Sequence, residues 1–71
     1  MDFKERVFNA FRNRIKSGQN VESAIMFRDA DFPGATREEI SSFKNGIYAD
    51  KQIRGFILTQ VGIDEALEDV D

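Results

Sequence analysis

The chain has neither cysteine nor histidine among its 71 residues. The absence of cysteine excludes disulfides and thiolate metal sites, and the absence of histidine removes the commonest general base. A hydrolase would have to be assembled from serines, lysines, one tyrosine and carboxylates, and the carboxylates fall in predicted helix caps and at the acidic end of the chain. We therefore expect no enzyme: no catalytic residue, no cofactor and no small-molecule substrate.

One loop has acidic residues at calcium-like spacing. Asp29 and Asp31 would occupy the first and third positions of an EF-hand-like loop, and Gly34 the sixth. Pro33 stands where a third oxygen ligand belongs, and the twelfth position is Ile40 in place of a bidentate glutamate. Because the pattern fails at two ligand positions, we expect no metal site.

Long apolar runs are also missing. A stretch such as Ile25–Phe27 is far shorter than the roughly 20 residues that span a bilayer. Residues 1–6 mix both charge signs and lack the apolar region of a secretory signal. We expect no membrane contact and a cytoplasmic location.

The composition is that of one small folded domain. Hydrophobic residues make up 41% of the chain and charged residues 32%, with a single proline. A chain of this length buries roughly 60% of its unfolded surface, which leaves room for one core. We therefore treat residues 1–71 as a single helical domain.

Apolar residues recur at spacings of three and four along most of the chain, which is typical of amphipathic helices. The predicted helices cover residues 3 to about 17, 21–30, 36 to about 45, 51–61 and a short terminal segment from Asp64 that holds Ala66, Leu67 and Val70. No alternating run of strand length is found. The sequence therefore predicts an all-α fold, a compact bundle of about five short helices that is SAM-like or helix-turn-helix-like.

Local signals place several helix ends. Thr36 and Glu39 have the spacing of a capping box, the strongest local signal in the chain. Gly18, the Asn45-Gly46 pair and Gly62 are predicted to end helices, Gly62 in the left-handed conformation. The inward faces predict one shared core, composed of Phe8, Phe11, Ile25, Ile40, Phe43, Ile57 and Val61.

Charge is distributed unevenly along the chain. Residues 1–20 carry five basic and two acidic side chains, and residues 21–71 carry five basic and eleven acidic ones. Met26 falls among polar residues of its predicted helix, and methionine suits adaptable contact surfaces. Our leading hypothesis is a non-enzymatic module, a regulator from a bacterium or its phage, that binds another protein or itself. The candidate contact residues are Met26, Arg14, Asp64, Glu65 and Glu68.

DNA binding is the alternative. Two helices joined by a turn at residues 31–35 resemble a helix-turn-helix in outline. The candidate contacts on the helix near Arg37 and on the basic first helix are Arg37, Ser41, Lys44, Arg12 and Lys16. Against this, the helix begins with the carboxylates of Glu38 and Glu39, and the whole chain is acidic, with a sequence pI of about 4.8.

Three short stretches resemble a known family. The chain reads Asp-Ala-Asp-Phe-Pro at 29–33, Glu-Ile-Ser-Ser-Phe at 39–43 and Asp-Glu-Ala at 64–66. Over roughly residues 29–66 it resembles the YozE-like family of small bacterial proteins, whose fold is similar to the sterile alpha motif. The resemblance implies a compact five-helix domain without an established activity and transfers no catalytic residue.

Overall fold

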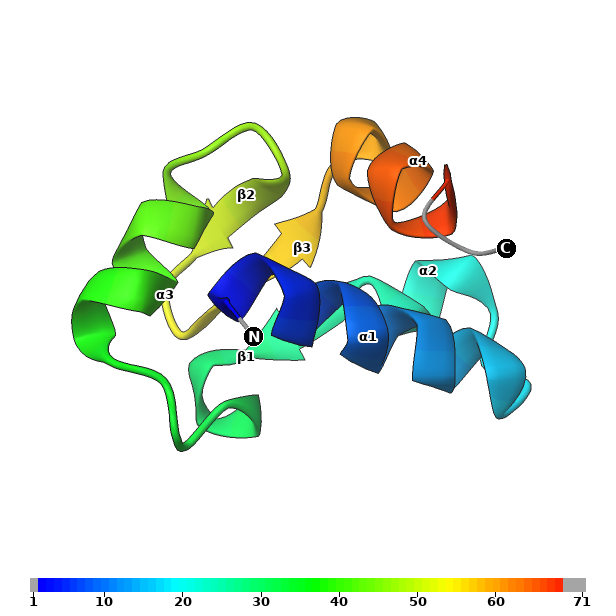
Figure 1. The fold of residues 1–71 in the computed structure, drawn as a ribbon, viewed down its shortest axis with the longest axis horizontal. Coiled ribbons are helices and arrows are strands. Elements are labelled where there is room, and N and C mark those ends of the chain that lie inside the picture. Colours follow the sequence, from blue (N-terminus) through cyan, green and yellow to red (C-terminus); the bar gives the residue numbers. More distant parts are fainter. Residues whose placement is uncertain (1, 69–71) are drawn as a thin grey trace.

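A computed structural model describes residues 2–68 of the chain. Helices and short strands alternate along it (Figure 1). The elements are α1 (Phe3–Lys16), α2 (Val21–Ala24), β1 (Met26–Arg28), the 3-10 turn η1 (Asp29–Asp31), α3 (Arg37–Lys44), β2 (Ala49–Gln52), β3 (Gly55–Leu58) and α4 (Gln60–Glu68). The mixed helix and sheet composition shows that the predicted all-α helical bundle is wrong.

The three strands form one antiparallel sheet in the order β1-β3-β2. The central strand β3 pairs Phe56 with Phe27 of β1 on one side and with Lys51 of β2 on the other. Strands β2 and β3 form a hairpin closed by the two residues Ile53 and Arg54. This hairpin occupies most of the segment that the apolar spacing predicts as a helix over 51–61.

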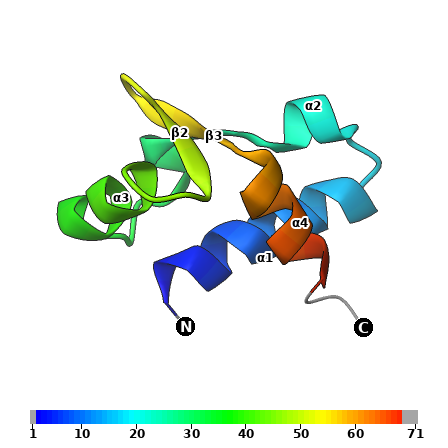
Figure 2. The same ribbon diagram turned by 90° about the horizontal axis from the view of Figure 1, so that it is seen from above.

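The core lies between α1 and one face of the sheet, with α3 and α4 at its two ends (Figure 2). Phe56 is its centre: it is almost fully buried, and its ring contacts other rings at centroid distances of 5.2–6.5 Å. The rings around it are those of Phe3, Phe27, Phe32 and Phe43. Aromatic packing therefore supplies most of the core in a chain without disulfides.

Two helices, α1 and α3, lie where the sequence predicts them. Asp2 caps α1 through the Glu5 amide at 2.8 Å, and Gly18 follows its end with a φ of 99°. At α3 the capping box is present: the Glu39 amide donates to the Thr36 hydroxyl at 3.1 Å, and the Thr36 amide donates to the Glu39 carboxylate at 2.9 Å. Local hydrogen bonding fixes these ends without help from distant residues.

The other predicted helices have wrong bounds or are replaced by strands. The segment 21–30 is helical only to Ala24 and then becomes β1 and η1. Helix α4 begins at Gln60, before the predicted start at Asp64, and Val70 lies outside the described residues. Gly62 does not end a helix: it lies within α4, where an added Cβ would stand 2.4 Å from the carbonyl oxygen of Tyr48. Because α4 packs closely on the chain before β2, position 62 has no room for a side chain.

The predicted core is partly confirmed. Phe8, Phe11 and Phe43 are buried, as predicted. Three isoleucines are only partly buried: Ile25, Ile40 and Ile57. Val61 is 49% exposed because the 51–61 helix that would turn it inward does not exist.

Between residues 2 and 68, no helix has the length and apolar character needed to cross a membrane.

Candidate functional site

Helix α3 and the β2–β3 hairpin lie together at one end of the molecule (Figure 2). The outer face of α3 follows helical spacing and carries short polar side chains and one carboxylate, at Glu38, Ser41, Ser42 and Asn45. These side chains are exposed. The end of the molecule therefore presents hydrogen-bonding groups on a rigid, capped helix.

A groove of about 460 Å³ runs between η1, the turn after it, α3 and β2. Phe32, Pro33 and Ile40 give it an apolar wall, and the cations that line it are Arg37, Lys44 and Lys51. Asp29 is the single carboxylate among the described residues around it. The groove is therefore predominantly cationic although the whole chain is acidic.

Lys44 does not face an incoming ligand. Its side chain is only 8% exposed, and its ammonium donates to both carboxylate oxygens of Asp29, at 3.1 and 3.2 Å. A buried cation needs such a partner, so this pair fastens α3 to η1. Of the predicted contacts on α3, Arg37 and Ser41 remain exposed, whereas Lys44 is held in the ion pair.

The hairpin tip is the most prominent exposed feature of this end. Ile53 is 96% exposed, and Arg54 beside it is also exposed. The Asp29 amide donates to the Arg54 carbonyl at 2.9 Å, which anchors the tip to η1. Gly55 makes this possible, because a Cβ there would lie 2.0 Å from the Phe27 carbonyl oxygen. The tip therefore projects from a fixed base.

The exposed charges of this end have both signs, with a small positive excess. Around α3, η1 and the hairpin, the carboxylates of Asp31, Glu38 and Asp50 are accompanied by a slightly larger set of exposed cations. That set comprises Arg28, Arg37, Lys51 and Arg54. Sequence reasoning missed Arg28, Lys51, Ile53 and Arg54. Gly55, directly after a polar stretch, is a sequence signal against a continuous helix over 51–61.

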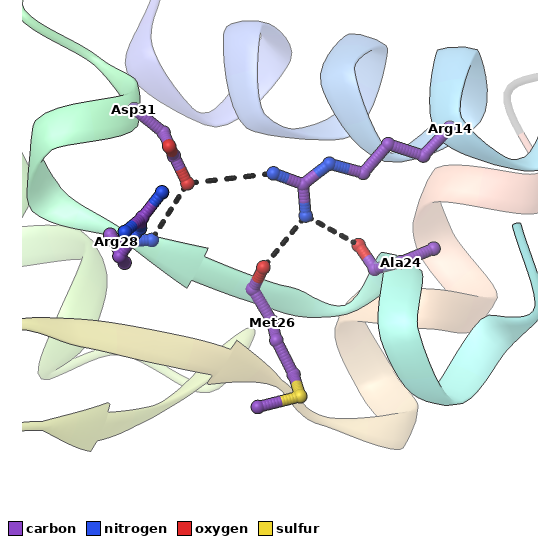
Figure 3. A network of polar contacts seen from close by, with 5 residues as sticks. All are labelled: Arg14, Ala24, Met26, Arg28 and Asp31. Atoms are coloured by element: carbon purple, nitrogen blue, oxygen red, sulfur yellow. Dashed lines mark hydrogen bonds and ion pairs between the residues drawn. The ribbon is translucent and has the colours of Figure 1, made fainter.

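Arg14 has a structural task (Figure 3). Its guanidinium donates to the Met26 carbonyl at 2.7 Å and to the Ala24 carbonyl at 3.3 Å, and it lies 3.4 Å from the Asp31 carboxylate. Asp31 also accepts from the Arg28 amide at 2.9 Å. These bonds cover backbone groups along the free edge of β1, which would otherwise be open to another strand.

The oppositely charged ends of the chain pair with each other. Lys4 lies 3.5 Å from Glu65, and Arg12 donates to the Ala66 carbonyl at 2.8 Å near the end of α4. A hydrogen bond to Glu65, helped by burial, raises the pKa of the Tyr48 hydroxyl. Burial lowers the pKa of Lys4, but attraction to Tyr48 and Glu65 outweighs it and leaves that pKa raised. The charge asymmetry of the sequence thus has an intramolecular explanation.

The other predicted contact residues are dispersed. Lys16 is exposed at the far end of α1, Asp64 accepts from the side-chain Nε2 of Gln60 at 2.8 Å within α4, and Glu68 is exposed. Met26 is 59% exposed in β1, opposite Ile57. No three acidic side chains within residues 2–68 gather in a way that would hold a metal ion.

Models of protein families, curated proteins and solved structures give no significant match to this chain. The YozE-like resemblance stays a prediction, while the five-helix fold that it implies is wrong.

Proposed function

We propose that the protein binds double-stranded DNA with α3 and the β2–β3 hairpin. The observation that carries the proposal is the exposed hairpin tip, Ile53 and Arg54, held beside the polar outer face of a capped helix. A helix fits the major groove, and an arginine with an apolar neighbour suits contact with a backbone or the narrower groove. This keeps the DNA-binding alternative without its helix-turn-helix fold, because β1 and η1 follow α2. The hairpin is added to the contacts, and Lys44, Arg12 and Lys16 are removed from them.

Each group has a distinct role. Arg37, Lys51 and Arg54 supply charge for phosphates, which gives affinity without sequence preference. Ser41, Ser42 and Asn45 supply donors and acceptors at the spacing of one helix face, which base edges require for direct readout. Asp29 is neutralised by Lys44 and so repels phosphates little.

The net negative charge of the chain limits its affinity for DNA, but it is compatible with a DNA contact through α3 and the hairpin. Part of the negative charge lies on α4, at Asp64, Glu65 and Glu68, away from α3 and the hairpin (Figure 1). Glu38 is the exposed carboxylate on the outer face of α3 and would face phosphates. With three phosphate contacts, raising salt from 50 to 150 mM should weaken binding about 20-fold.

Fluorescence anisotropy with a labelled duplex in 50 mM salt tests the proposal. Arg54→Ala should weaken binding and reduce the log-log salt slope by about one. Lys16→Ala removes the same charge from the distant end of α1 and should change binding far less. Glu38→Gln should strengthen binding, because it removes a carboxylate that faces phosphates.

Two results would overturn DNA binding through this end. One is the absence of a titratable anisotropy change in 50 mM salt. The other is an equal loss for Arg54→Ala and Lys16→Ala, which would reflect net charge alone.

One observation supports a second function, the binding of another protein. Met26 and Ile57 lie opposite each other on the sheet face that no described element covers (Figure 2). A captured protein partner that is lost with Met26→Asp but kept with Arg54→Ala would favour this second function.

A further inference from the structure

A second hollow lies on the other side of α3, between that helix and the start of α1. Its volume is about 690 Å³, larger than that of the groove beside the hairpin. Its apolar lining comes from four side chains: Phe3, Phe43, Ile47 and Tyr48. Ile47 is 67% exposed here. An open apolar floor of this size suits an apolar side chain from outside.

The rim of this hollow is acidic. Asp2, Glu38 and Glu39 line it, and Lys4 is the single cation among the described lining residues. Lys4 is already paired with Glu65. Hydrogen bonds from Thr36 lower the pKa of the Glu39 carboxyl, so Glu39 is charged at neutral pH. An occupant should therefore be apolar at its centre and basic at its flanks.

The hairpin tip has this chemistry. Ile53 is 96% exposed, so its side chain has almost no contact within its own chain. Lys51 and Arg54 flank it in the sequence. The hollow is lined by residues 2–4 and by residues between 38 and 48, so the tip does not fill the hollow of its own chain.

We propose that the hairpin tip of one copy inserts Ile53 into this hollow on a second copy. Arg54 and Lys51 then face the carboxylates of Asp2, Glu38 and Glu39. Tip and hollow are different surfaces. Two copies can therefore each insert a tip into the other's hollow, or successive copies can associate head to tail. The contact is small, so association is weak, with dissociation constants between micromolar and millimolar.

This charge pattern disfavours acidic and uncharged occupants. Three carboxylates repel an acidic peptide and a phosphate backbone, and an uncharged apolar molecule leaves the rim unmatched. The opposite charges at the two ends of the chain do not drive the association, because Lys4 and Arg12 are engaged with α4.

Sedimentation velocity from about 10 µM to 1 mM, without DNA, tests the contact. The wild type should shift toward larger species as concentration rises. Ile53→Ser should raise the dissociation constant at least about 10-fold, because it removes a buried branched side chain. Val61→Ser, at another exposed apolar residue, is the matched control and should associate as the wild type does.

Exchanging charged residues between the tip and the hollow tests whether these two surfaces contact each other. Arg54→Glu and Glu38→Lys should each weaken association alone, and an equimolar mixture should recover it. In the mixture, the residue at position 54 of each tip meets a residue of opposite charge at position 38 of the other variant. Circular dichroism of each variant verifies that it is folded.

A wild-type chain that remains monomeric at 1 mM would overturn the proposal, as would equal losses for Ile53→Ser and Val61→Ser, or a mixture that does not recover. These outcomes are independent of DNA binding, because no DNA is present.

Discussion

Replacing Gly55 with alanine distinguishes the hairpin from the helix that the apolar spacing predicts over 51–61. In an exposed helix the change should stabilise the protein by about 1 kcal/mol, because alanine is the better helix former. In the hairpin the new Cβ would lie 2.0 Å from the Phe27 carbonyl oxygen and 3.0 Å from the Cα of Arg28. The helix and the hairpin therefore predict opposite signs for the change in the free energy of unfolding.

The free-energy cost of Gly55→Ala follows from the movement of β1 that the new Cβ requires. Ordinary contact begins at 3.4 Å, so β1 would have to retreat by about 1.4 Å from β3. That movement breaks the pairing of Phe27 with Phe56 and the bond from the Asp29 amide to Arg54. Overpacking against backbone should cost about 3 kcal/mol, a large share of the roughly 4–10 kcal/mol available to a domain of this size.

Thermal unfolding followed by circular dichroism measures the effect. Gly55→Ala should lower Tm by about 12–24 °C. Gly46→Ala is the control, since its Cβ would meet its nearest neighbour, the Phe43 carbonyl oxygen, at an ordinary 3.5 Å and should change Tm little. An unchanged or higher Tm for Gly55→Ala would refute the hairpin.

The remaining predictions concern the two contacts that hold α3. Asp29→Asn should destabilise the protein by about 2 kcal/mol more than Lys44→Met, because only the first leaves a buried cation without its partner; equal urea midpoints would contradict this. The lowered pKa of Glu39 means that its contribution to stability is present above about pH 4.5 and is lost as pH falls through the folded-state pKa. Urea unfolding at pH 7 and pH 3 should therefore show a smaller acid loss for Glu39→Gln than for the wild type.

The helices that could be predicted are those with ends fixed locally. Asp2 caps α1, and Thr36 and Glu39 cap α3 through bonds to residues three positions away, so the sequence window contains the whole signal. Nothing distant has to be known for these elements.

The hairpin could not be predicted because its pattern imitates a helix. Ile53, Phe56, Ile57 and Val61 recur at three and four residues, yet Ile53 and Val61 are exposed. Strand β2 is an edge strand with mostly exposed residues, and β3 is a central strand with a continuous apolar run, so neither alternates clearly. The pairing of Phe56 with Phe27 also joins residues far apart in the chain.

The same limit applies to the candidate site. Arg37 and Ser41 follow from the periodicity of one helix, and both are exposed beside the hairpin. Lys44 and Arg12 also fit that kind of reasoning, but their partners Asp29 and Ala66 come from other elements. A basic residue in the sequence becomes a binding residue only if the fold leaves it unpaired.

An NMR titration of the ¹⁵N-labelled protein with a short duplex in 50 mM salt tests the central claim most directly. Binding through α3 and the hairpin predicts that amide shifts concentrate at residues 36–45 and 51–55 and diminish as salt is added. Unchanged spectra, or shifts confined to the sheet face around Met26 and Ile57, would contradict DNA binding by this end of the molecule.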